Sequence, residues 1–230
     1  MTQIAQQQCT ALSVKSREVS VPPLGLAGTL RMPDASKSLV IFAHGSGSSR
    51  FSPRNMKVAE ALNRHGIATL LFDLLTQREE LDRSNVFDMR LLSQRLVHVV
   101  HWVEQQQALK PLSLGLFGAS TGAGAALVAA AELGDRVRAV VSRGGRPDLA
   151  GSALEHVRAP TLLIVGGADH GVIELNQKAL ACLRGPKALE IVPGATHLFE
   201  EPGTLEQVIV QAIRWFESYL SAGGTAVASH

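Results

Sequence analysis

The sequence predicts an α/β fold, in which a mostly parallel, twisted sheet carries helices on both faces. Short apolar runs alternate along the chain with segments of helical periodicity, which is the pattern of α/β proteins. Several runs are continuously apolar, as in parallel strands that are buried on both faces. Hydrophobic residues make up 46% and charged residues 18% of the 230 residues, which favours one globular domain with a large core.

The first two predicted strands form an antiparallel hairpin, because residues 15–21 and 26–32 flank the turn formers Pro22, Pro23 and Gly25. The later strands are expected to be parallel. They are predicted over residues 39–43, 67–72, 112–117, 137–141, 161–165 and 188–192. Helices are predicted between them, over residues 53–65, 89–103, 122–133, 172–183 and 204–220.

Helix ends are marked by proline and glycine. Pro53 lies in the first turn of its helix, and Gly66, Gly134 and Gly185 follow the last turns of three others. In the long helix, apolar residues recur at spacings of three and four, which predicts one buried face; they are Met89, Leu92, Leu96, Val99 and Val103. A polar stretch, residues 76–85, is expected to lead into that helix.

The boundaries of the domain follow from these elements. Residues 14–220 are expected to form one domain without an insertion long enough for a large lid. Residues 1–13 and 221–230 are expected to be a flexible N-terminus and a flexible C-terminal tail. The sequence does not decide between a monomer and a dimer.

Charge and composition exclude several classes of function. The net charge of +2 and the lack of a basic run argue against a nucleic-acid partner. The longest apolar run, residues 125–131, is too short to span a membrane, and the N-terminus does not resemble a secretory signal. Cys9 and Cys182 are expected to be free thiols. Together these features predict a cytoplasmic protein that binds neither nucleic acid nor a membrane.

A nucleophilic serine is predicted at the end of the strand over residues 112–117. Gly118-Ala119-Ser120-Thr121-Gly122 matches the pattern G-x-S-x-G, and an alanine-rich helix follows at once. This strand–turn–helix context is what a nucleophile elbow requires, since the sharp turn leaves no room for side chains near the serine. A glycine-rich turn without chemical function is the alternative interpretation.

The base and the acid are sought at later strand ends, because a serine needs an adjacent histidine that a carboxylate orients. His197 lies directly after the last strand and is the predicted base. Asp169 follows the strand over residues 161–165 through two glycines and is the predicted acid. Asp148, one strand earlier, is a rival for the acid, and a turn-capping aspartate is the structural alternative for Asp169.

The oxyanion hole is predicted to use the backbone amides of Ser46 and Thr121. Ser46 lies in the small-residue loop that follows the strand over residues 39–43, where an amide can approach a substrate carbonyl oxygen. This loop lacks the spacing of nucleotide-binding motifs. His44 is interpreted as a support for the loop.

Two arginines form a second candidate site. Arg143 and Arg146 follow the strand over residues 137–141, and a pair of guanidinium groups there would clamp a carboxylate or phosphate of the substrate. A solvated or salt-bridged loop is the alternative. The pocket itself is expected to be shaped by residues 50–54, 75–87 and 142–156.

With these pieces in place, residues 14–220 resemble an α/β-hydrolase of the dienelactone hydrolase-like branch. The resemblance rests on Ala43-His44-Gly45-Ser46-Gly47, Gly118-Ala119-Ser120-Thr121-Gly122, Gly166-Gly167-Ala168-Asp169 and Ala195-Thr196-His197. Residues 72–76 and 142–149 are similar to a subgroup of that branch, some of whose members are fused to phosphoribosyltransferase-like domains. Dienelactone hydrolases proper carry a cysteine nucleophile, so Ser120 favours an esterase-type activity instead.

The resemblance implies a serine hydrolase that acts on a small ester, lactone or thioester through Ser120, His197 and Asp169. It implies no metal and no organic cofactor. A non-catalytic ligand-binding protein of the same fold, or an acyltransferase that uses the same three residues, remains an alternative.

Overall fold

The computed structural model describes residues 13–221, so most of both predicted flexible ends, and Cys9, lie outside the described range. Its strands are β1 (Val14–Val21), β2 (Leu26–Pro33), β3 (Ser38–Ala43), β4 (Ala68–Phe72), β5 (Ser113–Ala119), β6 (Val137–Arg143), β7 (Thr161–Gly166) and β8 (Lys187–Val192). Its α-helices are α1 (Pro53–Arg64), α2 (Gln77–Glu80), α3 (Met89–Gln105), α4 (Thr121–Leu133), α5 (His170–Cys182) and α6 (Thr204–Leu220). The 3-10 helices are Asn85–Phe87, Gly134–Arg136 and Pro147–His156.

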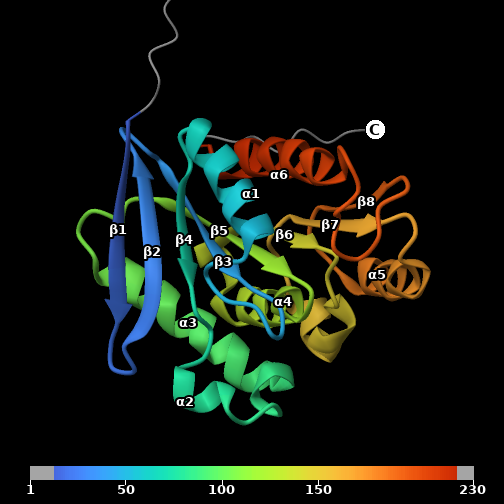
Figure 1. Ribbon diagram of the computed structural model, residues 1–230, viewed down its shortest axis with the longest axis horizontal. Coiled ribbons are helices and arrows are strands. Elements are labelled where there is room, and N and C mark those ends of the chain that lie inside the picture. The colour runs from blue at the N-terminus through green and yellow to red at the C-terminus, as the bar shows by residue number, and fades with distance from the viewer. Residues whose placement is uncertain (1–12, 222–230) are drawn as a thin grey trace, which may run out of the picture.

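The eight strands form one sheet in the order β1-β2-β4-β3-β5-β6-β7-β8 (Figure 1). The pairs β1–β2 and β2–β4 are antiparallel, and every later pair is parallel. The predicted hairpin and the predicted parallel sheet are therefore both confirmed. Strand β3, which is buried along its whole length, lies between β4 and β5, so the chain reverses its direction of travel across the sheet there.

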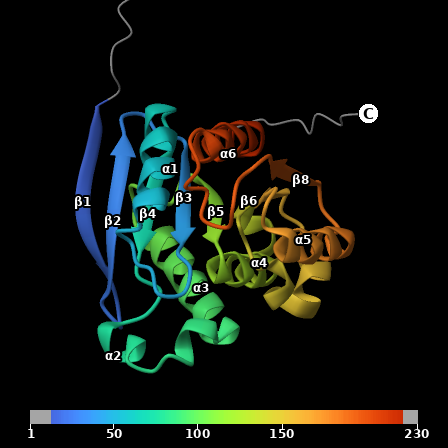
Figure 2. The same ribbon diagram turned by 45° about the vertical axis from the view of Figure 1, so that its right-hand side comes forward.

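Helices cover both faces of the sheet, as predicted. Helices α1 and α6 lie together on one face, and α3, α4 and α5 lie on the other (Figures 1 and 2). Val58 of α1 and Phe216 of α6 are fully buried in one core, and Leu96 of α3 is fully buried in the other. The small residues of α4 let this helix approach the sheet closely, since ten of its 13 positions are buried.

Two segments for which no helix was predicted contain helical turns. The polar stretch before α3 contains α2, which begins with a capping box in which Thr76 and Glu79 exchange side-chain and backbone hydrogen bonds. The segment after β6 forms the 3-10 helix Pro147–His156, interrupted at Gly151. In the part of the chain that the structure describes, no helix combines the length and the apolar character that crossing a bilayer requires.

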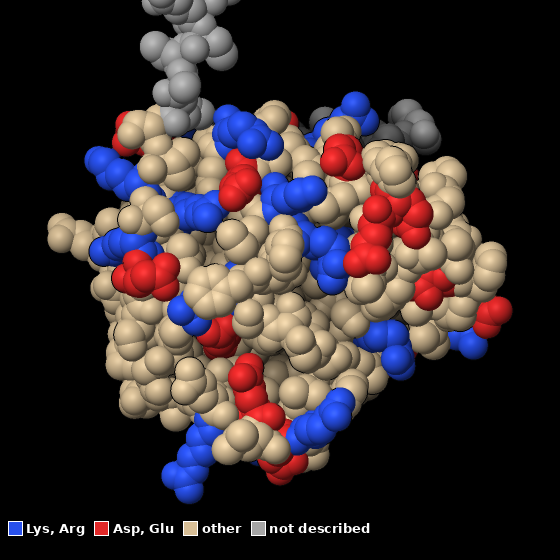
Figure 3. Space-filling model, in the orientation of Figure 1, with Lys and Arg blue, Asp and Glu red and all other residues tan. Residues whose placement is uncertain are grey.

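Acidic and basic side chains are intermixed on the face of the molecule shown in Figure 3. This distribution matches the small net charge of +2.

Candidate active site

Three side chains converge at the carboxyl edge of the sheet, where open parallel sheets bind ligands. Ser120 follows β5 directly. Asp169 follows β7, and His197 follows β8. Because β5, β6, β7 and β8 are neighbours in the sheet, the turns that leave these strands lie side by side.

Ser120 sits in a strained turn between β5 and α4. Its φ of 51° lies in the left-handed region, which is uncommon for a residue other than glycine. The flanking glycines are required, because a Cβ on Gly118 would lie 2.4 Å from the Cα of Ala123, and one on Gly122 would lie 2.3 Å from the carbonyl oxygen of Ala43. This is the nucleophile-elbow geometry that G-x-S-x-G predicts.

His197 links the serine to the aspartate. Its Nδ1 lies 2.7 Å from Oδ2 of Asp169, and its Nε2 lies 3.3 Å from Oγ of Ser120. A carboxylate at Nδ1 favours the tautomer that carries its proton there, which leaves Nε2 to accept a proton from the serine. The side chain of His197 is 37% exposed and that of Asp169 only 17%, so the histidine is open to solvent and the acid is sheltered.

The turns that carry Asp169 and His197 are bonded to each other. The amide of Ala168 donates to the carbonyl oxygen of Ala195 over 2.9 Å, and a Cβ on Gly166 would lie 2.3 Å from that same oxygen. Glu201 braces the histidine loop by accepting from the amide and the hydroxyl of Thr196. Hydrogen bonding to Thr196 lowers the pKa of the Glu201 carboxyl.

Asp148, the rival acid, is directed elsewhere. Its two carboxylate oxygens accept from Nε and Nη2 of Arg146, at 2.9 and 2.7 Å. The structure thus brings Asp169, and not Asp148, to the histidine.

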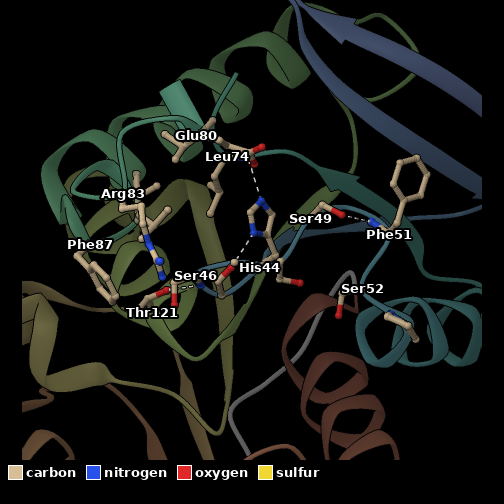
Figure 4. Close-up of a pocket in the computed structure, with 17 residues that line it drawn as sticks. His44, Ser46, Ser49, Phe51, Ser52, Leu74, Glu80, Arg83, Phe87 and Thr121 are labelled. Carbon is tan, nitrogen blue, oxygen red and sulfur yellow. Dashed lines mark hydrogen bonds between the residues drawn. The ribbon is translucent and has the colours of Figure 1, made fainter. Parts of the chain in front are cut away.

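The two predicted oxyanion donors, the amides of Ser46 and Thr121, differ in whether they already have a hydrogen-bond acceptor. Thr121 is the first residue of α4, so its amide has no acceptor within its own helix. The amide of Ser46, by contrast, already donates to Oγ1 of Thr121 over 2.9 Å (Figure 4). In this structure a neighbouring hydroxyl therefore occupies the amide of Ser46, and its role as an oxyanion donor stays a prediction.

His44 supports the loop that holds Ser46, as its position suggested. Its Nε2 accepts from the amide of Leu74 at 3.1 Å, so its proton sits on Nδ1 and is donated to the carbonyl oxygen of Gly45 at 3.0 Å (Figure 4). Burial lowers the pKa of His44, while Gly45, Asp73 and Glu80 act in the opposite direction. The ring therefore stays neutral and ties β3 to the segment after β4.

The predicted arginine clamp does not form. Arg143 is the last residue of β6 and is buried, where Nη2 donates to Oδ1 of Asn55 at 3.2 Å. Burial, with a contribution from Arg54, lowers the pKa of Arg143 to about 10. Arg146 is paired with Asp148, which corresponds to the salt-bridged alternative. The correction has a simple cause, since β6 extends two residues further than predicted and carries Arg143 into the core.

The glycines between these arginines shape the site. The amide of Ser120 donates to the carbonyl oxygen of Arg143, and the amide of Arg146 donates to that of Ser120. A Cβ on Gly144 would lie 2.9 Å from the carbonyl oxygen of His197, and one on Gly145 would lie 2.6 Å from the Cβ of Ala123. The segment therefore packs its backbone between the elbow and the histidine loop.

A cavity of about 660 Å³ opens beside Ser46 and Thr121 (Figure 4). Residues 44–49 and 51–53 form one wall. The other wall is formed by Leu74, Leu75, Glu80, Arg83, Val86, Phe87 and Leu92. The segments 50–54 and 75–87 were expected here, but no residue of 142–156 lines this cavity. Within the expected segment, Glu80, Arg83, Val86 and Phe87 were not predicted individually, although the pattern T-x-x-E at Thr76–Glu79 is a readable helix start that places this segment.

Comparison with known proteins identifies the family. The model of a family described as an alpha/beta hydrolase domain matches residues 36–214. The chain belongs to the α/β-hydrolase family. A crystal structure described as dienelactone hydrolase from Anabaena variabilis is 55% identical to this α/β-hydrolase. It covers 91% of this chain and 99% of its own, with a TM-score of 0.87. The resemblance to the dienelactone hydrolase-like branch is thus confirmed.

Two further relatives share part of their length or the fold with this chain. A Mycobacterium tuberculosis protein named as a candidate phosphoribosyl transferase is 59% identical over 207 residues, which are 90% of this chain and 47% of the relative. This α/β-hydrolase therefore spans about half of the relative's length. Est1E from Butyrivibrio proteoclasticus shares the fold with a TM-score of 0.74 at 17% identity, covering 88% of this chain and 97% of its own.

Proposed function

We propose that this α/β-hydrolase cleaves a small ester, lactone or thioester through an acyl-enzyme on Ser120. The hydrogen-bonded row Ser120–His197–Asp169 carries the proposal, because a serine oxygen, an imidazole and a carboxylate in this order are what nucleophilic acyl transfer needs. The family match supports the broader statement that the chain is a hydrolase.

In the proposed reaction, Oγ of Ser120 bonds to the acyl carbon while its proton moves to Nε2 of His197. The carbonyl π electrons move to the oxygen, which becomes the oxyanion beside the amide of Thr121. Collapse of this intermediate breaks the bond to the leaving group, which takes the proton from His197. Water then attacks the acyl carbon while His197 takes its proton, and the bond to Oγ of Ser120 breaks as that oxygen regains the proton. The carboxylate of Asp169 stabilises the imidazolium that forms in both steps.

The cavity beside Ser46 and Thr121 supports a substrate of modest size. Its volume of about 660 Å³ lies within the range of small-molecule sites, and its walls combine serine side chains with Leu75, Val86 and Phe87. The cavity runs from the predicted oxyanion position toward α2 and α3, so it would hold the acyl or the leaving group of the ester.

The deciding experiment is the Ser120→Ala variant. We expect the wild-type protein to hydrolyse short p-nitrophenyl esters and to be labelled stoichiometrically by a fluorophosphonate, and the variant to do neither. The Ser142→Ala variant is a matched control, because Ser142 is a buried serine of β6 and should leave turnover in place. Full ester turnover by Ser120→Ala would overturn the proposal. A wild-type protein that binds esters without labelling or turnover would instead support a ligand-binding role.

A further inference from the structure

The hydroxyl of Thr121 lies in the residue next to the nucleophile and accepts a hydrogen bond from the amide of Ser46 over 2.9 Å. Thr121 is nearly buried at 5% exposure, yet it lines the cavity together with Ser46. A Cβ on the adjoining Gly45 would lie 3.0 Å from the Cβ and 3.7 Å from Oγ of Ser120. The loop that carries Ser46 is therefore packed directly against the nucleophile.

The bond from Ser46 leaves the hydroxyl proton of Thr121 available. A hydroxyl accepts through its lone pairs and still donates one proton. Oγ1 of Thr121 receives the amide proton of Ser46, and among the described residues its own proton has no acceptor. The hydroxyl also has no helical carbonyl behind it, because the residues three and four positions earlier belong to β5.

The hydrogen bond from the amide of Ser46 strengthens the hydroxyl of Thr121 as a donor. An amide that donates to a hydroxyl oxygen makes that hydroxyl a better donor, since successive hydrogen bonds polarise one another in a sheltered environment. The two hydrogen bonds that the oxyanion needs are then available from a single residue, through its amide and its hydroxyl. Figure 4 shows Thr121 and Ser46 joined at one end of the cavity.

We propose that Thr121 stabilises the oxyanion twice, through its backbone N–H and through its side-chain O–H, and that the amide of Ser46 acts as a positioning donor to that hydroxyl. This inference rests on the proposed serine hydrolase activity. No proton leaves the hydroxyl, since the oxyanion forms when Ser120 attacks and is lost again when the leaving group departs. Thr121 thus becomes a catalytic residue, while Ser46 acts through it.

Three variants test the proposal: Thr121→Val removes the hydroxyl at constant shape, Thr121→Ser keeps it, and Thr121→Ala removes it together with the methyl group. We expect Thr121→Val and Thr121→Ala to lower kcat by about 10²–10³-fold with little change in KM, the typical loss for one oxyanion donor. Thr121→Ser should retain most of the wild-type kcat. The affinity for a boronic acid, which mimics the tetrahedral intermediate, should fall in parallel with kcat.

The control is Thr161→Val. Thr161 is the first residue of β7, and its buried hydroxyl donates to the carbonyl oxygen of Ala159; neither residue lines the cavity. The kcat of this variant should remain that of the wild type. If Thr121→Ala keeps or exceeds the wild-type kcat, the freed amide of Ser46 is the true donor and the proposal is wrong. Each variant is judged by its kcat relative to that of the wild-type protein, so the test requires an active wild type. An inactive and unlabelled wild-type protein would instead refute the proposed function itself, and the inference with it.

Discussion

Oδ2 of Asp169 lies 2.7 Å from Nδ1 of His197, although the two residues are 28 positions apart and follow different strands. The contact depends on backbone hydrogen bonding between their turns, in which Ala168 donates to Ala195. The bonded turns hold the two residues together, and a carboxylate at Nδ1 favours the tautomer of the imidazole that carries its proton there.

Replacement of Asp169 by Asn should lower kcat on short esters by about 10⁴-fold, because an amide at this position favours the tautomer that leaves Nε2 protonated. The matched variant is Asp148→Asn, which changes the rival carboxylate and should leave kcat within a few-fold of the wild type. Steady-state kinetics on both variants decide the assignment. A large loss in Asp148→Asn with a small one in Asp169→Asn would reverse it.

Gly145→Ala should destabilise the protein and slow the reaction of Ser120 with a fluorophosphonate. Arg146→Gln should change neither the stability nor this rate by much. The added Cβ would lie 1.9 Å from Oγ of Ser142 in β6 and 2.6 Å from the Cβ of Ala123 in α4. Because both neighbours are buried, the segment next to the elbow has to shift, and overpacking of this kind costs about 1–3 kcal/mol. Arg146→Gln removes a partly exposed ion pair worth at most about 1 kcal/mol. Denaturant unfolding measures the stability, and the rate of fluorophosphonate labelling measures the elbow.

Gly171→Ala provides the internal control for that experiment. Gly171 lies in the first turn of α5, and a Cβ there meets open space. Alanine should therefore stabilise the protein by up to about 1 kcal/mol. Equal effects of alanine at Gly145 and at Gly171 would contradict the packing argument.

His44 should make stability depend on pH below 6.5. Burial lowers the pKa of His44 in the folded state below its ordinary value of 6.5, so the unfolded chain binds the proton more readily. Stability contributed by the neutral ring is fully present above pH 6.5 and is lost as the pH falls below it, at up to about 1.4 kcal/mol per pH unit.

The variant His44→Gln isolates this effect, because glutamine can accept from Leu74 and donate to Gly45 but does not titrate. Unfolding free energies of the two proteins, measured from about pH 5 to 8, should differ by a constant above pH 6.5 and change steadily below it. A difference that is independent of pH would show that the ring remains accessible to protons in the folded state.

The sequence predicts the parts of this molecule that depend on local pattern. Residues 39–43 form a buried strand because a continuous apolar run is stable only where both faces of the strand are covered. Ser120, Asp169 and His197 meet because carboxyl ends of parallel strands share one edge. Arg143 could not be placed in the same way, since its partner Asn55 is 88 positions away in α1. The bond between Ser46 and Thr121 likewise joins residues 75 positions apart.

The wall of the cavity between residues 76 and 88 is held by its own contacts. Its capping box closes α2 internally, and Glu79 also pairs with Arg95 of α3. None of these bonds involves the elbow or the histidine loop. For the proposed hydrolase, this separation means that an exchange of the short segment should change the range of substrates while the proposed triad stays in place.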